Sequence, residues 1–252
     1  MNNNNELIKN LERDLVLLRL PYIAEHHNQA IEEGVRRKKS TRTVFAELFA
    51  GEVIRKEEIA LERRIRTARL PREKTLAEYD FDFPKRIAKQ KLLSWFDCNF
   101  IEKSSNLILI GNQGVGKTHL LTALGYTACR YGIKTRFVRA IDMLNHLTVA
   151  QLNGTLGRVL QMYTKPDLLL LDELGYLPVD KRGADLMFQV VAARYEQGSI
   201  VITTNRPFKD WDAIFDVDKT LASAMIDRLM HHGDALIITG RSYRVKDRKL
   251  EA

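Results

Sequence analysis

The chain has 252 residues, of which 40 are Lys or Arg, 32 are Asp or Glu and 45% are hydrophobic. This length suits one sizeable globular domain with a smaller appendage, and the apolar fraction excludes a wholly disordered or fibrous chain. The formal charge of +8 favours an acidic partner, with nucleic acid first and a membrane surface second.

The N-terminal residues, Met1 to Glu6, lack the charged and then apolar pattern of a signal peptide. No apolar run approaches the roughly 18 to 20 residues needed to cross a bilayer. Cys98 and Cys129 lie far apart without Cys-x-x-Cys spacing, which argues against a disulfide scaffold or a zinc site. We therefore expect a cytoplasmic protein without a membrane partner.

Helical periodicity dominates the first seventy residues. Apolar residues recur at helical spacing over 7–18, and Pro21 then opens a second helix that Gly34 is expected to close. A longer helical pattern follows over about 43–67. These patterns predict a small all-α N-terminal domain at residues 1–70.

Prolines and aspartates interrupt the helical pattern beyond this domain, so we predict a linker at 71–85 and a second domain at 86–252. The positive charge is unevenly placed: the net charge is +4 over 1–105, +1 over 106–240 and +3 over 241–252. An ordinary solvated helix surface is the alternative interpretation of any one basic run. The candidate DNA-binding residues in these basic runs are Arg36, Arg37, Lys38, Lys39, Arg63 and Arg64.

Short apolar runs alternate with helical patterns in the second domain. The apolar runs are 107–110, 135–138, 168–171, 200–203 and 235–238. The helical patterns lie near 117–131, 141–163, 180–197 and 219–231. This alternation predicts an α/β domain with a doubly wound parallel sheet, whose chemistry lies at the carboxyl ends of the strands.

A phosphate-binding loop follows the first of these strands. Residues Gly111 to Thr118 match the pattern G-x-x-x-x-G-K-[ST] between a predicted strand and a predicted helix. The amides of such a glycine turn bind phosphate oxygens, Lys117 can reach the β and γ phosphates, and the Thr118 hydroxyl can ligate Mg²⁺. The candidate ATP-binding residues here are Gly111, Asn112, Gln113, Gly114, Val115, Gly116, Lys117, Thr118 and His119.

The third apolar run ends in the acidic pair Asp172 and Glu173. An acid at a strand end beside a P-loop can hold Mg²⁺, and a second carboxylate can deprotonate the attacking water. The alternative is that Asp172 only caps the following turn. Because Glu173 supplies a base for water, the pair favours hydrolysis over phosphoryl transfer to a small molecule.

Two later residues extend this candidate catalytic set. Asn205 follows the fourth strand and can orient the attacking water, although an Asn at this place is also a common turn former. Arg228 lies in a helical pattern after that strand and can complete the site of a neighbouring subunit as an arginine finger. A salt bridge with Asp227 or another acid is the structural alternative for Arg228.

Together these motifs resemble those of AAA+ ATPases of the initiator and helicase-loader type. Longer strings, among them LLLLDELGYLP at 168–178, RYEQGSIVITTN at 194–205 and IDRLMHHGDALIITGRSYR at 226–244, are similar to those of the IstB-like ATPases of bacterial insertion sequences. A more distant resemblance is to the helicase loader DnaC. The similarity extends from about residue 5 to residue 246.

The resemblance implies an AAA+ domain with a five-stranded parallel sheet and an ATP–Mg²⁺ site at a subunit interface. It implies a homo-oligomer that assembles with ATP on duplex DNA with little sequence preference and stimulates a DDE-type transposase, at the nucleoid of a bacterial cell. The residues that match family positions are Lys117 and Thr118 in the P-loop, Asp172 and Glu173 as metal ligand and base, Asn205 as first sensor, Arg228 as arginine finger and Arg244 as a late phosphate-sensing residue. Because initiator-type relatives carry extra helices facing nucleic acid in the region that corresponds to 141–163, the resemblance also implies Arg158 as a candidate DNA-binding residue.

Three other functions share part of this pattern. A DnaC-like replicative-helicase loader has the same ATPase and a different partner. A P-loop kinase for a small molecule would need neither DNA nor an oligomer. A DNA-binding scaffold would hold ATP as a structural ligand only.

Overall fold

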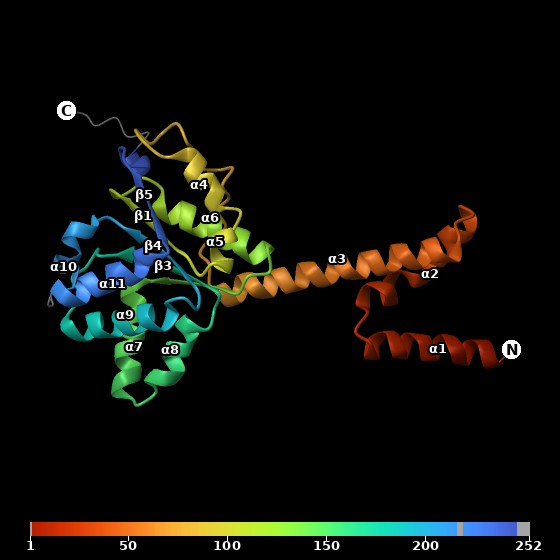
Figure 1. The fold of residues 1–252 in the computed structure, drawn as a ribbon. Helices are drawn as coiled ribbons and strands as arrows, with labels where there is room; N and C mark the ends of the chain where they lie inside the picture. Colours follow the sequence, from red (N-terminus) through yellow and green to blue (C-terminus); the bar gives the residue numbers. More distant parts are fainter. Residues whose placement is uncertain (1, 216–218, 246–252) are drawn as a thin grey trace. The chain divides into compact units, whose positions relative to one another are not determined.

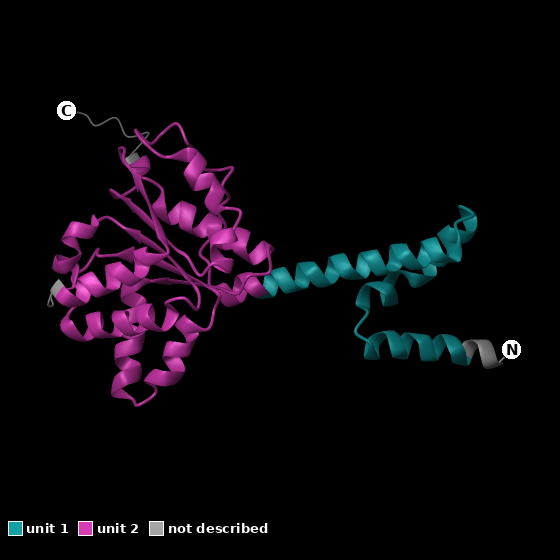
Figure 2. Cartoon of the chain, in the orientation of Figure 1, with its two compact units in different colours: residues 1–63 teal, residues 64–252 magenta. Residues whose placement is uncertain are grey.

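The computed structural model describes residues 2–215 and 219–245. The chain divides into two compact units, unit 1 at residues 1–63 and unit 2 at residues 64–252 (Figure 2). The division falls inside a continuous helix, before the linker expected at 71–85. The expected linker belongs to unit 2, because its residues pack on the segment that contains the P-loop.

Unit 1 is helical and comprises α1 (Asn2–Leu17), α2 (Pro21–Arg36) and most of α3 (Thr41–Ala68) (Figure 1). Gly34 does not close α2, which continues to its end at Arg36. A Cβ at Gly34 would lie 2.6 Å from Cγ2 of Val44, so this glycine permits close packing of α2 against α3. Neither the 28-residue α3 nor any other helix in the described ranges is long and apolar enough to cross a membrane.

The core of unit 1 is small. A carboxylate supplements it: Glu52 of α3, only 2% exposed, accepts a hydrogen bond of 3.1 Å from the backbone N–H of Ile23 in the first turn of α2. A carboxylate at a helix N-terminus satisfies a backbone donor and complements the helix dipole. The buried apolar side chains of this core are Leu15, Ile23, Val44 and Leu48.

Unit 2 has the predicted α/β architecture around a five-stranded sheet. The strand order is β2-β3-β4-β1-β5, and every neighbouring pair is parallel. The strands are β1 (Asn106–Gly111), β2 (Thr135–Arg139), β3 (Leu168–Leu174), β4 (Ser199–Thr204) and β5 (Gly233–Ile238). Their carboxyl ends share one edge of the sheet, which positions the site.

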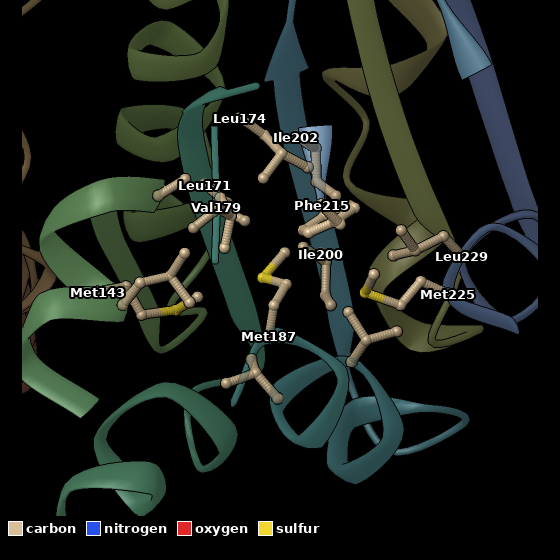
Figure 3. Close-up of a cluster of buried hydrophobic side chains, with 14 of the residues drawn as sticks. Met143, Leu171, Leu174, Val179, Met187, Ile200, Ile202, Phe215, Met225 and Leu229 are labelled. Carbon is tan, nitrogen blue, oxygen red and sulfur yellow. The ribbon is translucent and has the colours of Figure 1, made fainter. Parts of the chain in front are cut away.

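Helices cover both faces of this sheet, because alternate residues of each buried strand point to opposite sides. Ile108 belongs to one apolar cluster and Leu107 to the other. Figure 3 shows part of the first cluster, where Met143, Met187 and Met225 lie against β3 and β4. The face with Ile108 packs on α7 (Ala140–Leu152), α8 (Leu156–Thr164), α9 (Lys181–Arg194), α10 (Trp211–Ile214) and α11 (Lys219–His231). The face with Leu107 packs on α4 (Lys89–Trp95), α5 (Asn99–Glu102) and α6 (Lys117–Arg130).

The region expected as one helix near 141–163 is two helices, α7 and α8. Gly154 has a φ of +68° between them, a left-handed conformation that ends a helix and favours glycine. The apolar periodicity continues on both sides of this break, so periodicity alone did not locate it.

A buried arginine stabilises the edge of the sheet where the strands start, opposite to their carboxyl ends. Arg194, only 1% exposed, donates hydrogen bonds of 2.7 to 3.2 Å to five backbone carbonyls around the starts of β3 and β4. Burial lowers the pKa of its guanidinium to about 10. Since hydrogen bonds to buried backbone carbonyls stabilise the folded chain, Arg194 has a structural role, and it lies away from the nucleotide site.

Candidate nucleotide site

The P-loop has the backbone needed to hold a phosphate. It joins the end of β1 to the start of α6, and Gly114 and Gly116 have φ values of +76° and +94°. A Cβ at Gly116 would lie 2.5 Å from Cε2 of Tyr79, so neither the conformation nor the space suits another residue. Successive amides before a helix N-terminus form an anion-binding concavity.

Lys117 is the buried cation of this loop. It is 5% exposed, and its ammonium donates to the carbonyl oxygens of Gly111 at 2.7 Å and Asn112 at 2.8 Å. Burial lowers the pKa of Lys117 to about 8, against the opposing influence of the Asp172 and Glu173 carboxylates. An anion bound beside this ammonium would favour its charged form.

A pocket of about 370 Å³ opens at the loop. The sequence-predicted residues in its lining are Gly114, Val115, Gly116, Lys117, Thr118, His119, Glu173 and Arg244. Gly111, Asn112 and Gln113 lie in the same loop but outside the lining. The pocket therefore unites the P-loop, one carboxylate of the acidic pair and the C-terminal arginine.

The segment 71–84, which we call the strap, covers this loop. The Tyr79 hydroxyl donates to the carbonyl of Val115 at 3.1 Å, and Nε2 of His119 lies 2.8 Å from the carbonyl oxygen of Thr75. Burial raises the pKa of Tyr79 to about 12, so its hydroxyl stays protonated as a donor. These contacts explain why the expected linker belongs to unit 2.

Aromatic side chains from the strap and the C-terminal segment meet at the pocket. Phe83 lines it and packs edge to face on Tyr243, with ring centroids 4.8 Å apart. The backbone N–H of Tyr243 donates to the carbonyl of Gly114 at 2.8 Å. Phe81 instead contacts Tyr79 in the apolar core. Of these two phenylalanines of the strap, only Phe83 lines the pocket.

The hydroxyl and carboxylate proposed as metal ligands are adjacent. The Thr118 hydroxyl lies 3.1 and 3.0 Å from the two carboxylate oxygens of Asp172. The Thr203 hydroxyl of β4 donates to the same carboxylate at 2.5 Å. Burial raises the pKa of Asp172, while the two hydroxyl donors oppose that shift. This set of hard oxygen donors fits Mg²⁺.

Thr203 also forms a hydrogen bond with Glu173. The sequence predicted Glu173 as the base but did not predict this contact. Glu173 has a φ of +62°, and its backbone N–H donates to the Thr203 hydroxyl at 2.9 Å. A single hydroxyl thus fixes both members of the acidic pair. The sequence signal for this role is the pair of threonines, Thr203 and Thr204, that ends β4 after the apolar residues 200–202.

Asn205 and Arg228 lie outside the lining of the nucleotide pocket. Asn205 directly follows β4, and its buried Oδ1 has no hydrogen-bond partner among the described residues. A water molecule is a suitable donor for such an oxygen. Arg228 on α11 donates to the carbonyl of Ala224 at 3.1 Å, and its guanidinium lies 4.9 Å from the ring centroid of Phe188.

The candidate DNA-binding residues belong to both units and differ in their contacts. Three of the four residues at 36–39 form ion pairs with glutamates of unit 1, at 2.5 to 3.5 Å. In unit 2, Nε of Arg64 donates to the carbonyl of Cys129 at 2.8 Å, which is a structural contact. Arg158 is exposed on α8. Their role in DNA binding stays a prediction.

The chain is similar to proteins of bacterial insertion sequences over nearly its whole length. The insertion sequence IS232 putative ATP-binding protein of Bacillus thuringiensis subsp. berliner is 36% identical over 98% of this chain and 96% of its own length. The IS21 putative ATP-binding protein of Pseudomonas aeruginosa is 36% identical over 95% of this chain and 90% of its own.

Structural likeness points to the same AAA+ class. A structure of the replication initiator DnaA bound to AMPPCP and single-stranded DNA has a TM-score of 0.56 and 25% identity, covering 68% of this chain and 51% of that chain. The sequence model of the family of IstB-like ATP-binding proteins matches residues 14–251. With its P-loop pocket and five-stranded parallel sheet, the chain belongs to the family of IstB-like ATP-binding proteins.

Proposed function

We propose that this protein is a Mg²⁺-dependent ATPase that oligomerises on duplex DNA, selects or remodels target DNA and stimulates a DDE-type transposase. The observation that carries the proposal is that Thr118 and Glu173 line the P-loop pocket and that the Asp172 carboxylate lies 3.0 Å from the Thr118 hydroxyl. Its relatives are named as insertion-sequence ATP-binding proteins. In the cell it would act in the cytoplasm, at the bacterial nucleoid.

ATP binding follows from the loop and its surroundings. The amides of the glycine turn and the Lys117 ammonium would hold the phosphates, and Phe83 and Tyr243 would border the remainder of the nucleotide. Thr118 and Asp172 would hold Mg²⁺, which supplies Lewis-acid stabilisation of charge on the phosphate oxygens. Arg244 lines the same pocket, as do the cationic side chains of Arg72 and Lys74.

Hydrolysis needs a base, an oriented water and compensation of developing charge. Glu173 lines the pocket and would accept the proton of the attacking water. The unpartnered Oδ1 of Asn205 would accept a hydrogen bond from that water. Lys117 would stabilise the negative charge that grows on the transferred phosphoryl group.

Arg228 would act on the nucleotide of a neighbouring subunit. It is only partly buried and lies outside its own chain's pocket, where its guanidinium contacts Phe188 instead of an acid. A trans-acting guanidinium stabilises the transition state and couples ATP binding to assembly, because the nucleotide then contacts both subunits.

DNA binding would use the positive surplus at the ends of the chain, where residues 1–105 have a net charge of +4. Contacts to the phosphate backbone carry little sequence information, which suits a target selector. A DnaC-like helicase loader would have the same ATPase, and copurification with a hexameric helicase instead of a transposase would reveal it. Similarity to insertion-sequence proteins over 98% of the chain favours the transposition role.

A mixing experiment tests the shared site. Arg228→Ala and Glu173→Gln proteins are each expected to have little ATPase activity on duplex DNA, for different reasons. Their equimolar mixture should recover activity, because some interfaces combine an intact Glu173 with an intact Arg228. Arg182→Ala, at the exposed start of α9, is the control for loss of an arginine. An inactive mixture of proteins that still assemble would contradict a shared site.

A further inference from the structure

A second pocket adjoins the nucleotide pocket. It has a volume of about 730 Å³, and Thr118 and Pro71 line both pockets. It also reaches Asp172, so it opens at the proposed metal ligands. Its lining is rich in cationic side chains, namely Arg69, Arg136 and Arg139.

Arg136 of β2 is the innermost cation of this pocket. It is 8% exposed, and its Nε has no hydrogen-bond partner in the part of the chain that the structure describes. Its guanidinium lies 5.9 Å from the ring centroid of Tyr163, and one terminal nitrogen donates to the carbonyl of Thr67 at 3.4 Å. A buried guanidinium with an unused donor is costly unless an acceptor reaches it.

The neighbouring charges do not neutralise Arg136. Arg139 forms a two-bond ion pair with Asp142, at 2.7 and 3.1 Å. Neither Arg136 nor Arg69 forms an ion pair within the described residues. Burial and the nearby charge of Arg69 both lower the pKa of Arg136. Of the two carboxylates in the lining, Asp142 pairs with Arg139, and Asp172 contacts the hydroxyls of Thr118 and Thr203. The pocket thus holds two guanidinium groups without ion pairs among the described residues, beside the site where the proposed hydrolysis would release phosphate.

We propose that this pocket binds inorganic phosphate, the product of ATP hydrolysis, on its way out of the protein. The inference rests on the proposed hydrolysis at Thr118 and Asp172. A phosphate dianion presents several oxygens to the planar donors of Arg69 and Arg136. Because Arg136 is buried, a small anion fits this position better than a phosphate fixed on a DNA duplex.

The test measures phosphate binding directly and independently of turnover. The full-length protein is saturated with Mg²⁺ and a non-hydrolysable ATP analogue, so that the P-loop is filled. Inorganic phosphate is then titrated and its ³¹P line broadening is recorded. Arg136→Gln and the more exposed Arg69→Gln are compared with Arg182→Gln, which makes the same charge change outside the pocket.

We expect saturable broadening for the original protein and for Arg182→Gln, with phosphate affinity at least about tenfold weaker in the two pocket variants. Unchanged phosphate affinity in Arg69→Gln and in folded Arg136→Gln would overturn the proposal. The proposal would also be overturned if the original protein bound no phosphate and the two pocket variants bound a short DNA duplex more weakly, because the pocket would then bind DNA. Failure of the analogue to bind would refute the ATPase proposal instead, and its own titration detects that separately.

Discussion

Replacement of Thr203 by valine removes the hydroxyl that joins the two carboxylates of the site. Valine has nearly the same shape, and Thr203 is 1% exposed, so the packing at the end of β4 should change little. The lost atom donates to Asp172 at 2.5 Å and accepts from the backbone N–H of Glu173 at 2.9 Å. Thr203→Val therefore tests how the acidic pair is positioned.

The expected magnitude follows from these two hydrogen bonds. A hydrogen bond to a charged group contributes about 1.5 to 3 kcal/mol, and an unsatisfied buried donor costs about 1 to 3 kcal/mol. Asp172 keeps its contact with Thr118, so we expect a loss of about 2 to 4 kcal/mol in the free energy of unfolding. Glu173 should also leave its left-handed conformation, which the hydrogen bond to Thr203 supports, and kcat should fall about tenfold or more.

Urea unfolding and steady-state ATP turnover on duplex DNA measure the two effects. Thr204→Val is the matched control. Thr204 is also buried in β4, but its hydroxyl forms hydrogen bonds with the backbone of Arg206 and not with the acidic pair. It should keep kcat much closer to that of the original protein. Unchanged stability and unchanged kcat in Thr203→Val would refute the positioning of the acidic pair by this hydroxyl.

Two further predictions concern the P-loop. The pKa of Lys117 in the folded protein is about 8, below its ordinary value of 10.5, so the ammonium loses its proton above about pH 8. ATP affinity measured by titration should therefore fall as the pH rises through this value, and Lys117→Arg should remove that fall. An ATP affinity of the original protein that does not change with pH would contradict this prediction. Gly116→Ala should weaken ATP binding more than about tenfold, because its Cβ would meet Tyr79 at 2.5 Å and its φ is +94°. Gly132 has a similar φ of +84°, but a Cβ there would have no atom of the described residues within 4 Å apart from its chain neighbours. Calorimetry of Gly132→Ala should therefore show lost stability with ATP affinity retained, and equal ATP affinities for the two variants would refute the steric account.

The elements that the sequence predicted well are those that depend on neighbouring residues. The P-loop spans eight consecutive residues between a strand and a helix, and the acidic pair directly ends an apolar run. A five-stranded parallel sheet followed from apolar runs that alternate with helical patterns. The break at Gly154 was missed because a single glycine leaves the helical periodicity on both sides intact.

Contacts between distant residues could not be predicted in the same way. The hydroxyl of Thr203 meets a carboxylate 31 positions earlier, and Tyr79 reaches a carbonyl 36 positions later. Tyr79 lies in a segment whose prolines and aspartates are typical of a linker, whereas its ring and hydroxyl pack on the P-loop. Such contacts depend on strand order and chain crossing, which local composition does not specify.

The central claim is that Glu173 activates the water that attacks ATP, and Glu173→Gln tests it most directly. Glutamine keeps the size of the side chain and removes its capacity as a base. On duplex DNA with Mg²⁺, we expect ATP affinity within about threefold of the original protein and turnover lower by about a hundredfold or more. Loss of ATP binding with intact turnover per bound nucleotide would contradict the claim.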